Sequence, residues 1–139
     1  MAAAEHVGVF TYSPLAGGLL SGKYGAQLRP KKGRLISNPM YKTRYEGAAN
    51  YDAAERFTAL AKERGVHPAA LAVAWVAAHP AVIAPLVGAR NLEQLNAVLG
   101  AIEIDMTEAL YSEIAALSPT PAPATDRNEE RSANNYGAR

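Results

Sequence analysis

Only two segments of this chain have the composition of buried β-strands, and residues 13–80 separate them. Residues 7–12 read VGVFTY and residues 81–87 read AVIAPLV, so neither segment contains a charged side chain. Runs that are apolar on both faces are typical of parallel strands, which are covered on both sides. Pro85 has no N–H for a strand ladder, so a local irregularity is expected there. Since helix signals fill much of the sequence between the strands, we expect a parallel α/β arrangement.

Two helices are expected between the strands. Asn50 or Asp52 can cap the first helix, and Gly65 can end it. Pro68 fits the first turn of the second helix, which Pro80 ends. The apolar spacing predicts that these helices face the core through Phe57, Leu60 and Ala61, and through Leu71, Ala74, Trp75 and Ala78.

Two further helices and a tail are expected after the second strand. Asn91 is a suitable N-cap, with Gln94 where the partner of a capping box belongs, and Thr107 can cap the last helix. Residues 119–139 are rich in Pro, Ala, Asn and charge, which predicts a flexible tail. The helical period of the first of these helices is given by Leu92, Leu95, Leu99 and Ile102. In the last helix, the residues expected to face inward are Leu110, Ile114 and Leu117.

Composition excludes several classes of function. The 14 Lys and Arg residues nearly balance the 13 Asp and Glu residues, so we expect no nucleic-acid partner. The absence of cysteine excludes disulfides, Cys-ligated zinc and thiol catalysis, and it fits a reducing compartment. The first residues lack the features of a signal peptide, so a cytoplasmic location is expected. The three histidines, at 6, 67 and 79, are dispersed, so we expect no metal site.

One uncharged stretch is long enough to cross a membrane. Residues 65–89 contain no Lys, Arg, Asp or Glu, and 25 residues of helix can span a bilayer. However, Pro68, Pro80 and Pro85 divide this stretch into short elements, and most of its apolar residues are alanine. We therefore expect no membrane-spanning segment.

The loop after the first strand resembles a phosphate-binding motif only in part. Gly17 to Lys23 reads GGLLSGK, which matches the first seven positions of a P-loop. The eighth position is Tyr24, although Mg²⁺ binding needs a Ser or Thr hydroxyl there. A nucleoside triphosphatase is therefore not favoured.

The segment from residue 23 to about residue 50 is polar and is expected to be irregular. It carries a basic cluster of Arg29, Lys31, Lys32 and Arg34. This cluster is either a solvated loop or a phosphate clamp.

The loop after the second strand has the features of an anion site. Gly88 permits a close approach of the backbone, and a capped helix follows. Arg90 adds a guanidinium that suits phosphate, although an exposed Arg beside an ordinary cap has the same sequence. Tyr12 ends the first strand and reaches the same edge of the sheet if the strands are parallel. That tyrosine could stack on a flat ring or could belong to the core.

Several long motifs together resemble one known family. Residues 12–24 (YSPLAGGLLSGKY), 71–80 (LAVAWVAAHP) and 86–95 (LVGARNLEQL), with the helix after Thr107, are similar to consecutive segments of aldo-keto reductases. The resemblance covers residues 7–118 and is closest to the branch with bacterial reductases and potassium-channel β subunits. It implies a partial (β/α)8 TIM barrel, formed by the last two βα units and the C-terminal helices, over residues 1–118.

The resemblance also implies a cofactor and its contacts. The family reduces aldehydes and ketones with NADPH, so NADP is the expected cofactor. Tyr12 would stack on the nicotinamide, and Ser13, Pro14, Leu15, Ala16 and Gly17 would line the pyrophosphate. Lys23 and Arg34 would reach the phosphates, whereas Gly88, Arg90 and Gln94 would hold the 2′-phosphate and ribose.

This sequence departs from the family pattern in two respects. Ala97 and Val98 replace a usual Glu–Asn pair at the adenine, and each lost hydrogen bond would cost roughly 0.5–1.5 kcal/mol. The family's catalytic Asp, Tyr, Lys and His lie before the seventh strand of the barrel, which is the strand that residues 7–12 resemble. No residues of this sequence match them, so no catalytic residue is assigned. We therefore expect a C-terminal fragment of an NADP-dependent reductase that is inactive alone.

Two alternatives to a reductase fragment are left open: a non-catalytic NADP-binding or regulatory module, and a non-functional truncated product. In the full-length protein, the substrate would be a small carbonyl compound. The fragment itself could self-associate or could associate with the missing part of the barrel.

Overall fold

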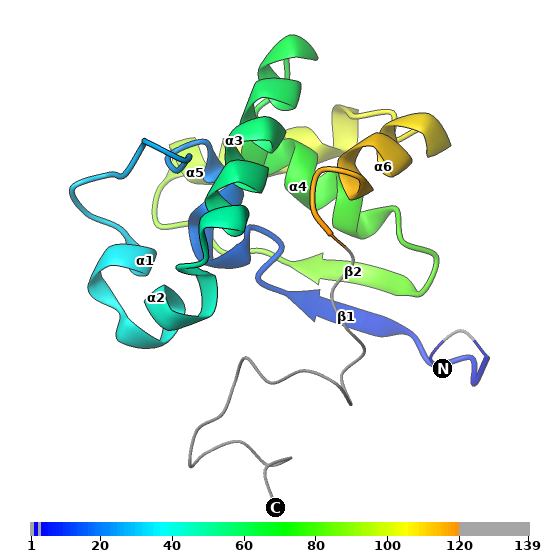
Figure 1. Ribbon diagram of the computed structural model, residues 1–139. Helices are drawn as coiled ribbons and strands as arrows, with labels where there is room; N and C mark the ends of the chain where they lie inside the picture. The colour runs from blue at the N-terminus through cyan, green and yellow to red at the C-terminus, as the bar shows by residue number, and fades with distance from the viewer. Residues whose placement is uncertain (1, 3, 120–139) are drawn as a thin grey trace, which may run out of the picture.

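The computed structural model describes residue 2 and residues 4–119 of the chain. It contains a parallel two-stranded sheet of β1 (Val9–Tyr12) and β2 (Val82–Leu86), with helix α4 packed on β2. Figure 1 shows the larger helices above one face of this sheet and no element of the described residues against the other face. The parallel α/β arrangement is confirmed. Apart from Pro119, the predicted tail lies outside the described residues.

The strand register contains one irregularity, which lies at Ile83. Val9 pairs with Val82, but Phe10 pairs with Ala84, so Ile83 has no partner of its own. The irregularity expected at Pro85 was therefore placed two residues too late, since Pro85 pairs with Thr11.

Residues 13–47 are more regular than the sequence predicts. The segment contains a 3₁₀-helix, η1 (Ala16–Ser21), and two short helices, α1 (Arg34–Ser37) and α2 (Pro39–Tyr45). Asn38 caps α2, because its Oδ1 accepts hydrogen bonds from the N–H groups of Met40 and Tyr41. The prediction of an irregular segment is confirmed for residues 23–33 but was wrong for residues 34–50, where α1, α2 and the start of the next helix lie. Helices this short depend on tertiary contacts more than on local periodicity.

Helix α3 (Ala48–Glu63) begins earlier than predicted. Its N-cap is Gly47 and neither Asn50 nor Asp52, which both lie in the helix. The predicted stop is confirmed at Gly65, which has a φ of +67°. The Gly65 N–H donates to the Lys62 carbonyl and the Val66 N–H to the Ala61 carbonyl, so the helix ends in a Schellman motif.

Helix α4 (Pro68–Ala77) is the central helix of the layer. Pro68 occupies its first turn as predicted, and the His67 Nδ1 accepts a hydrogen bond from the Ala69 N–H at 3.0 Å. The predicted single apolar face was too narrow, because every residue from 69 to 74 is buried. Ala78, predicted to face inward, is exposed beyond the end of the helix. A helix covered on several sides has no polar face to mark its orientation.

Three elements follow β2: α5 (Leu92–Leu99), the 3₁₀-helix η2 (Gly100–Glu103) and α6 (Glu108–Ala115). The predicted caps are confirmed, since Asn91 Oδ1 accepts from the Gln94 N–H and Thr107 Oγ1 from the Leu110 N–H. The inward face of α6 is confirmed through the buried Leu110 and Ile114. The residues with the predicted helical period are all exposed, and the last of them lies in η2 and not in α5: Leu92, Leu95, Leu99 and Ile102.

The core lies among the helices and away from the sheet. Its main cluster joins α3, α4 and α6, and a second cluster fixes the 13–47 segment to α3. Within the described residues, no helix is long and apolar enough to cross a membrane. The main cluster consists of Phe57, Leu60, Ala61, Leu71, Ala72, Leu110 and Ile114, and the second of Leu19, Tyr24, Leu35, Tyr51 and Ala54.

Candidate functional site

The loop after β1 is a tight turn with several residues in the left-handed region. Ser13 and Ala16 have φ values of +56° and +48°, and Gly17 follows at +68°. The Ala16 N–H donates to the Ser13 carbonyl at 2.9 Å, which closes the turn. Leu15 packs against two core clusters, so its side chain anchors the loop. Positive φ at non-glycine residues is costly and is found where surrounding packing enforces it.

Tyr12 is not a core residue. Its side chain is 74% exposed at the end of β1, beyond the partly buried Thr11. Of the two interpretations that the sequence left open, the structure excludes burial in the core. Burial raises the pKa of Tyr45 in α2, and the Tyr12 phenol contributes a smaller electrostatic effect in the same direction.

Gly17 is the contact point between the turn and α2. An added Cβ at Gly17 would lie 2.6 Å from the Tyr41 ring and 3.4 Å from the Tyr45 ring. The two tyrosine rings stack with centroids 6.4 Å apart. Because only a glycine leaves room for these rings, the 23–47 segment folds back onto the turn at this residue.

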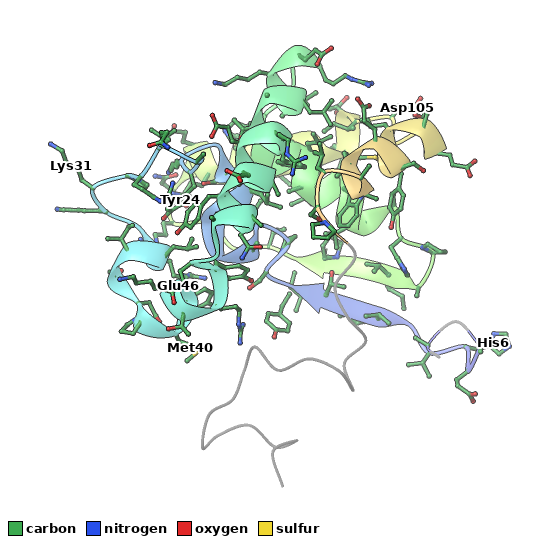
Figure 2. The ribbon with its side chains drawn as sticks, viewed as in Figure 1. His6, Tyr24, Lys31, Met40, Glu46 and Asp105 are labelled. Atoms are coloured by element: carbon green, nitrogen blue, oxygen red, sulfur yellow. The ribbon has the colours of Figure 1, made fainter. Side chains whose placement is uncertain are left out.

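The basic cluster is divided between structural and free side chains. The Arg29 guanidinium lies 3.5 Å from the Tyr51 ring centroid and donates to the backbone carbonyl of Gly25, so it holds the segment together. Lys31 projects away from the tip of the segment, whereas Tyr24 points inward beneath it (Figure 2). The cluster is therefore neither a uniformly solvated loop nor a single clamp.

Lys23 and Arg34 are both exposed on the same segment. Arg34 begins α1, and its guanidinium lies 5.1 Å from the Tyr41 ring centroid. Lys23 directly precedes the buried Tyr24, which fixes its backbone. Both cations thus remain available to solvent on a segment that its neighbours hold in place.

The loop after β2 places Arg90 in front of a capped helix. The Arg90 backbone N–H donates to Gln94 Oε1 at 3.1 Å, and the Gln94 N–H donates to Asn91 Oδ1 at 2.9 Å. This exchange is a capping box shifted by one residue, because the side chain of Gln94 accepts from the residue before the N-cap. Within residues 4–119, no side chain pairs with the Arg90 guanidinium. Gly88 has open space where a Cβ would stand.

The parallel register brings the two loops to one edge of the sheet. Tyr12 is the partner of Leu86, so the chain leaves both strands side by side. In Figure 1 both arrowheads point toward the side that holds α1, α2 and α5. His6 lies at the opposite end of β1 (Figure 2). Within the described ranges, no group of three or more His, Asp or Glu residues could hold a metal ion.

Sequence reasoning missed two residues of this edge and misjudged a third. Tyr41 and Tyr45 were not singled out, because no periodicity marks a helix as short as α2. Val98, which replaces a residue that the resemblance places at the adenine, is buried in a cluster with Ala69 and Val73. The preceding residue, Ala97, is partly exposed. Position 98 therefore belongs to the core between α4 and α5, whereas position 97 does not.

Comparisons with known proteins agree on one group of enzymes. A family model described as "Aldo/keto reductase family" matches residues 1–119. The chain is 34% identical over 119 residues to the uncharacterized oxidoreductase YrpG of Bacillus subtilis (strain 168), which covers 86% of this chain and 34% of YrpG. It is 32% identical over 124 residues to the protein tas of Escherichia coli (strain K12), covering 86% of this chain and 35% of tas.

A third relative extends the match to a eukaryote. An aldo-keto reductase of Babesia bovis is 32% identical over 115 residues, which are 80% of this chain and 40% of that protein. The chain therefore spans about a third of the length of the curated relatives that it matches.

Proposed function

This chain belongs to the aldo/keto reductase family, and we propose that it forms part of the NADP-binding end of an enzyme that reduces small aldehydes or ketones. The observation that carries the proposal is the parallel pairing of Tyr12 with Leu86. This pairing directs two loops to one sheet edge, and in α/β proteins ligands bind at the carboxyl ends of the strands.

The residues around Arg90 fit the phosphorylated ribose of NADP. The Arg90 guanidinium is exposed and has no partner among residues 4–119, while its backbone is fixed by Gln94. A planar guanidinium can bind a phosphate through two hydrogen bonds. Gly88 leaves the adjoining backbone uncovered, and Gln94 retains its amide nitrogen for a ribose hydroxyl.

The residues after β1 fit the nicotinamide and the pyrophosphate. Tyr12 offers an exposed ring for stacking. Residues 13–17 form the closed turn beside it, and Lys23 and Arg34 supply exposed positive charges. When bound, NADPH supplies the hydride for reduction of a carbonyl group. The part of the chain described here holds and orients that cofactor.

The general acid of the reaction is proposed to lie outside this sequence. Reduction of a carbonyl needs a proton donor at the carbonyl oxygen. None of the residues of this chain matches the catalytic Asp, Tyr, Lys and His that the family resemblance implies. We therefore propose that the chain binds NADPH, acts in the cytoplasm, and does not turn over substrate without further family sequence.

The test is a titration of the purified chain with NADPH and, separately, with NADH. We expect the fluorescence of NADPH to change on binding, with tighter binding of NADPH because only it carries the 2′-phosphate. A reactive aldehyde added to the complex should cause no loss of nicotinamide absorbance. Equal or undetectable binding of the two nucleotides would contradict the proposal, and turnover would contradict the assignment of the general acid.

A further inference from the structure

Half of the basic residues of the chain lie in the segment of residues 23–46. This segment contains seven of the 14 Lys and Arg residues, whereas Glu46 is its one residue among the 13 Asp and Glu residues. The proposed cofactor site uses Lys23 and Arg34 from this segment, so the other five cations and Glu46 are left outside it. The seven basic residues are Lys23, Arg29, Lys31, Lys32, Arg34, Lys42 and Arg44.

A cavity of about 320 Å³ lies in this segment, between α1, α2 and the first turn of α3. Leu35 and Tyr51 form its apolar floor, since both side chains are buried. A volume of this size is at the lower end of the range for small-molecule sites, which is about 300–1,000 Å³. The lining residues are Arg29, Leu35, Ile36, Lys42, Glu46 and Tyr51, and they all differ from the residues assigned to the cofactor.

The Arg29 guanidinium is held in place at this cavity, with part of its hydrogen-bonding capacity unused. Its central carbon lies 3.5 Å from the centroid of the Tyr51 ring, and its Nη1 atom donates to the backbone carbonyl groups of Gly25 and Leu28. Its Nε and Nη2 atoms have no hydrogen-bond partner within residues 4–119. A guanidinium that is already fixed in position loses little conformational freedom when its free edge binds a carboxylate.

The two other ionic side chains at the cavity have opposite charges. Lys42 lies in α2, and Glu46 directly follows the last residue of that helix. Both side chains are exposed, and in the part of the chain that the structure describes neither forms an ion pair or a hydrogen bond. With Arg29, the margin of the cavity therefore combines two cations and one carboxylate around an apolar floor.

We propose that this cavity binds a free amino acid with an aliphatic side chain, for which leucine is the probe. The α-carboxylate would bind to Arg29 and Lys42, the α-ammonium group would bind to Glu46, and the side chain would pack on Leu35 and Tyr51. A ligand with only a negative charge would be repelled by Glu46, and a ligand with only a positive charge would be repelled by the two cations. The zwitterion is the ligand class that satisfies all three ionic groups.

The experiment is isothermal titration calorimetry of the full chain, without nucleotide, with leucine and with two of its analogues. Isocaproate lacks the ammonium group and isoamylamine lacks the carboxylate, so we expect each to bind about fivefold more weakly than leucine. Glu46→Gln should weaken the binding of leucine but not of isocaproate, whereas Lys42→Gln should weaken the binding of both. Lys31→Gln is the matched control and should leave both affinities unchanged, because Lys31 is also exposed on this segment but does not line the cavity.

Three outcomes would overturn the inference. These are the absence of saturable leucine binding, equal affinities of the native chain for leucine and isocaproate, and equal weakening of leucine binding by Lys31→Gln and Lys42→Gln. The comparison of ligands uses the native chain, so it does not depend on whether a variant folds, and circular dichroism of each variant separates a lost site from a lost fold. Because no nucleotide is present, a failure of leucine binding is distinguishable from a failure of NADPH binding.

Discussion

Tyr12 and Leu86 are the last paired residues of the two parallel strands. Both side chains are exposed, and the loops that follow them leave the sheet at the same edge. The loops that carry the basic and glycine-rich residues, more than fifty positions apart in the sequence, thus begin at one edge of the sheet. The predictions below test this edge and the packing that supports it.

Replacement of Arg90 by alanine should weaken NADPH binding about tenfold, because the loss of one charge-assisted hydrogen bond is worth about 1.4 kcal/mol. NADH binding should change little, since it lacks the 2′-phosphate. The measurement is a nucleotide titration of each variant. Arg56→Ala is the control, because Arg56 is also exposed but lies on α3. Equal losses for both nucleotides would contradict the assigned role of Arg90.

Gly17→Ala should destabilise the fold more than Gly65→Ala does. The two glycines have nearly the same φ, +68° and +67°, so the backbone strain of roughly 1–2 kcal/mol is common to both substitutions. Only at Gly17 would the new methyl group meet a ring, that of Tyr41. Denaturant unfolding should show an additional loss of about 1 kcal/mol for Gly17→Ala. An equal decrease in the free energy of unfolding for the two variants would show that the Tyr41 ring moves aside without a loss of stability.

Val98→Asn, which restores the usual family residue, should reduce stability by about 1–3 kcal/mol. Val98 is only 5% exposed among Ala69 and Val73, so an amide there would be buried without a partner. Ala97→Glu, at the neighbouring and more exposed position, should change the free energy of unfolding by less than about 0.5 kcal/mol. Thermal unfolding of the two variants distinguishes them, and a stable Val98→Asn protein would place residue 98 outside the core.

Alkaline pH should destabilise the segment that holds Tyr24 and Tyr45. Burial raises the pKa of both phenols above the ordinary value of 10.0. The folded state therefore retains protons that the unfolded chain releases, so their contribution is complete below pH 10 and is lost as the pH rises through the higher folded pKa. Between about pH 8 and pH 11, the free energy of unfolding should decrease less steeply with pH for Tyr24→Phe and Tyr45→Phe than for the native chain. Unchanged slopes would exclude these two groups as the cause.

Local signals in the sequence predicted the elements whose ends are set by one or two residues. Asn91 and Thr107 cap their helices, and Gly65 ends α3, because capping depends on backbone groups within one turn. Asn50 and Asp52 are equally good caps in isolation, yet α3 begins before them. The choice of Gly47 depends on where α2 ends, which is not a local property.

The candidate site was predictable in part. Arg90, Tyr12 and the basic segment have suggestive chemistry, and the family resemblance added Lys23 and the turn at residues 13–17. No local pattern indicates that Arg29 is held by Tyr51 or that Tyr41 and Tyr45 pack on Gly17. These contacts join residues far apart in the chain, so they arise only when the 23–47 segment folds back.

By itself, the sequence determined two apolar strands, the caps of the helices and the family to which the chain belongs. Only the tertiary structure decided which apolar residues are covered: Val98 is buried, whereas Leu92 and Ile102 are exposed. The physical reason is that hydrophobic periodicity reports which side chains favour burial but not which neighbour is present to bury them. In the described part of this chain, Leu92, Leu95 and Leu99 of α5 have the spacing of a core face but are exposed, because no neighbouring element covers them.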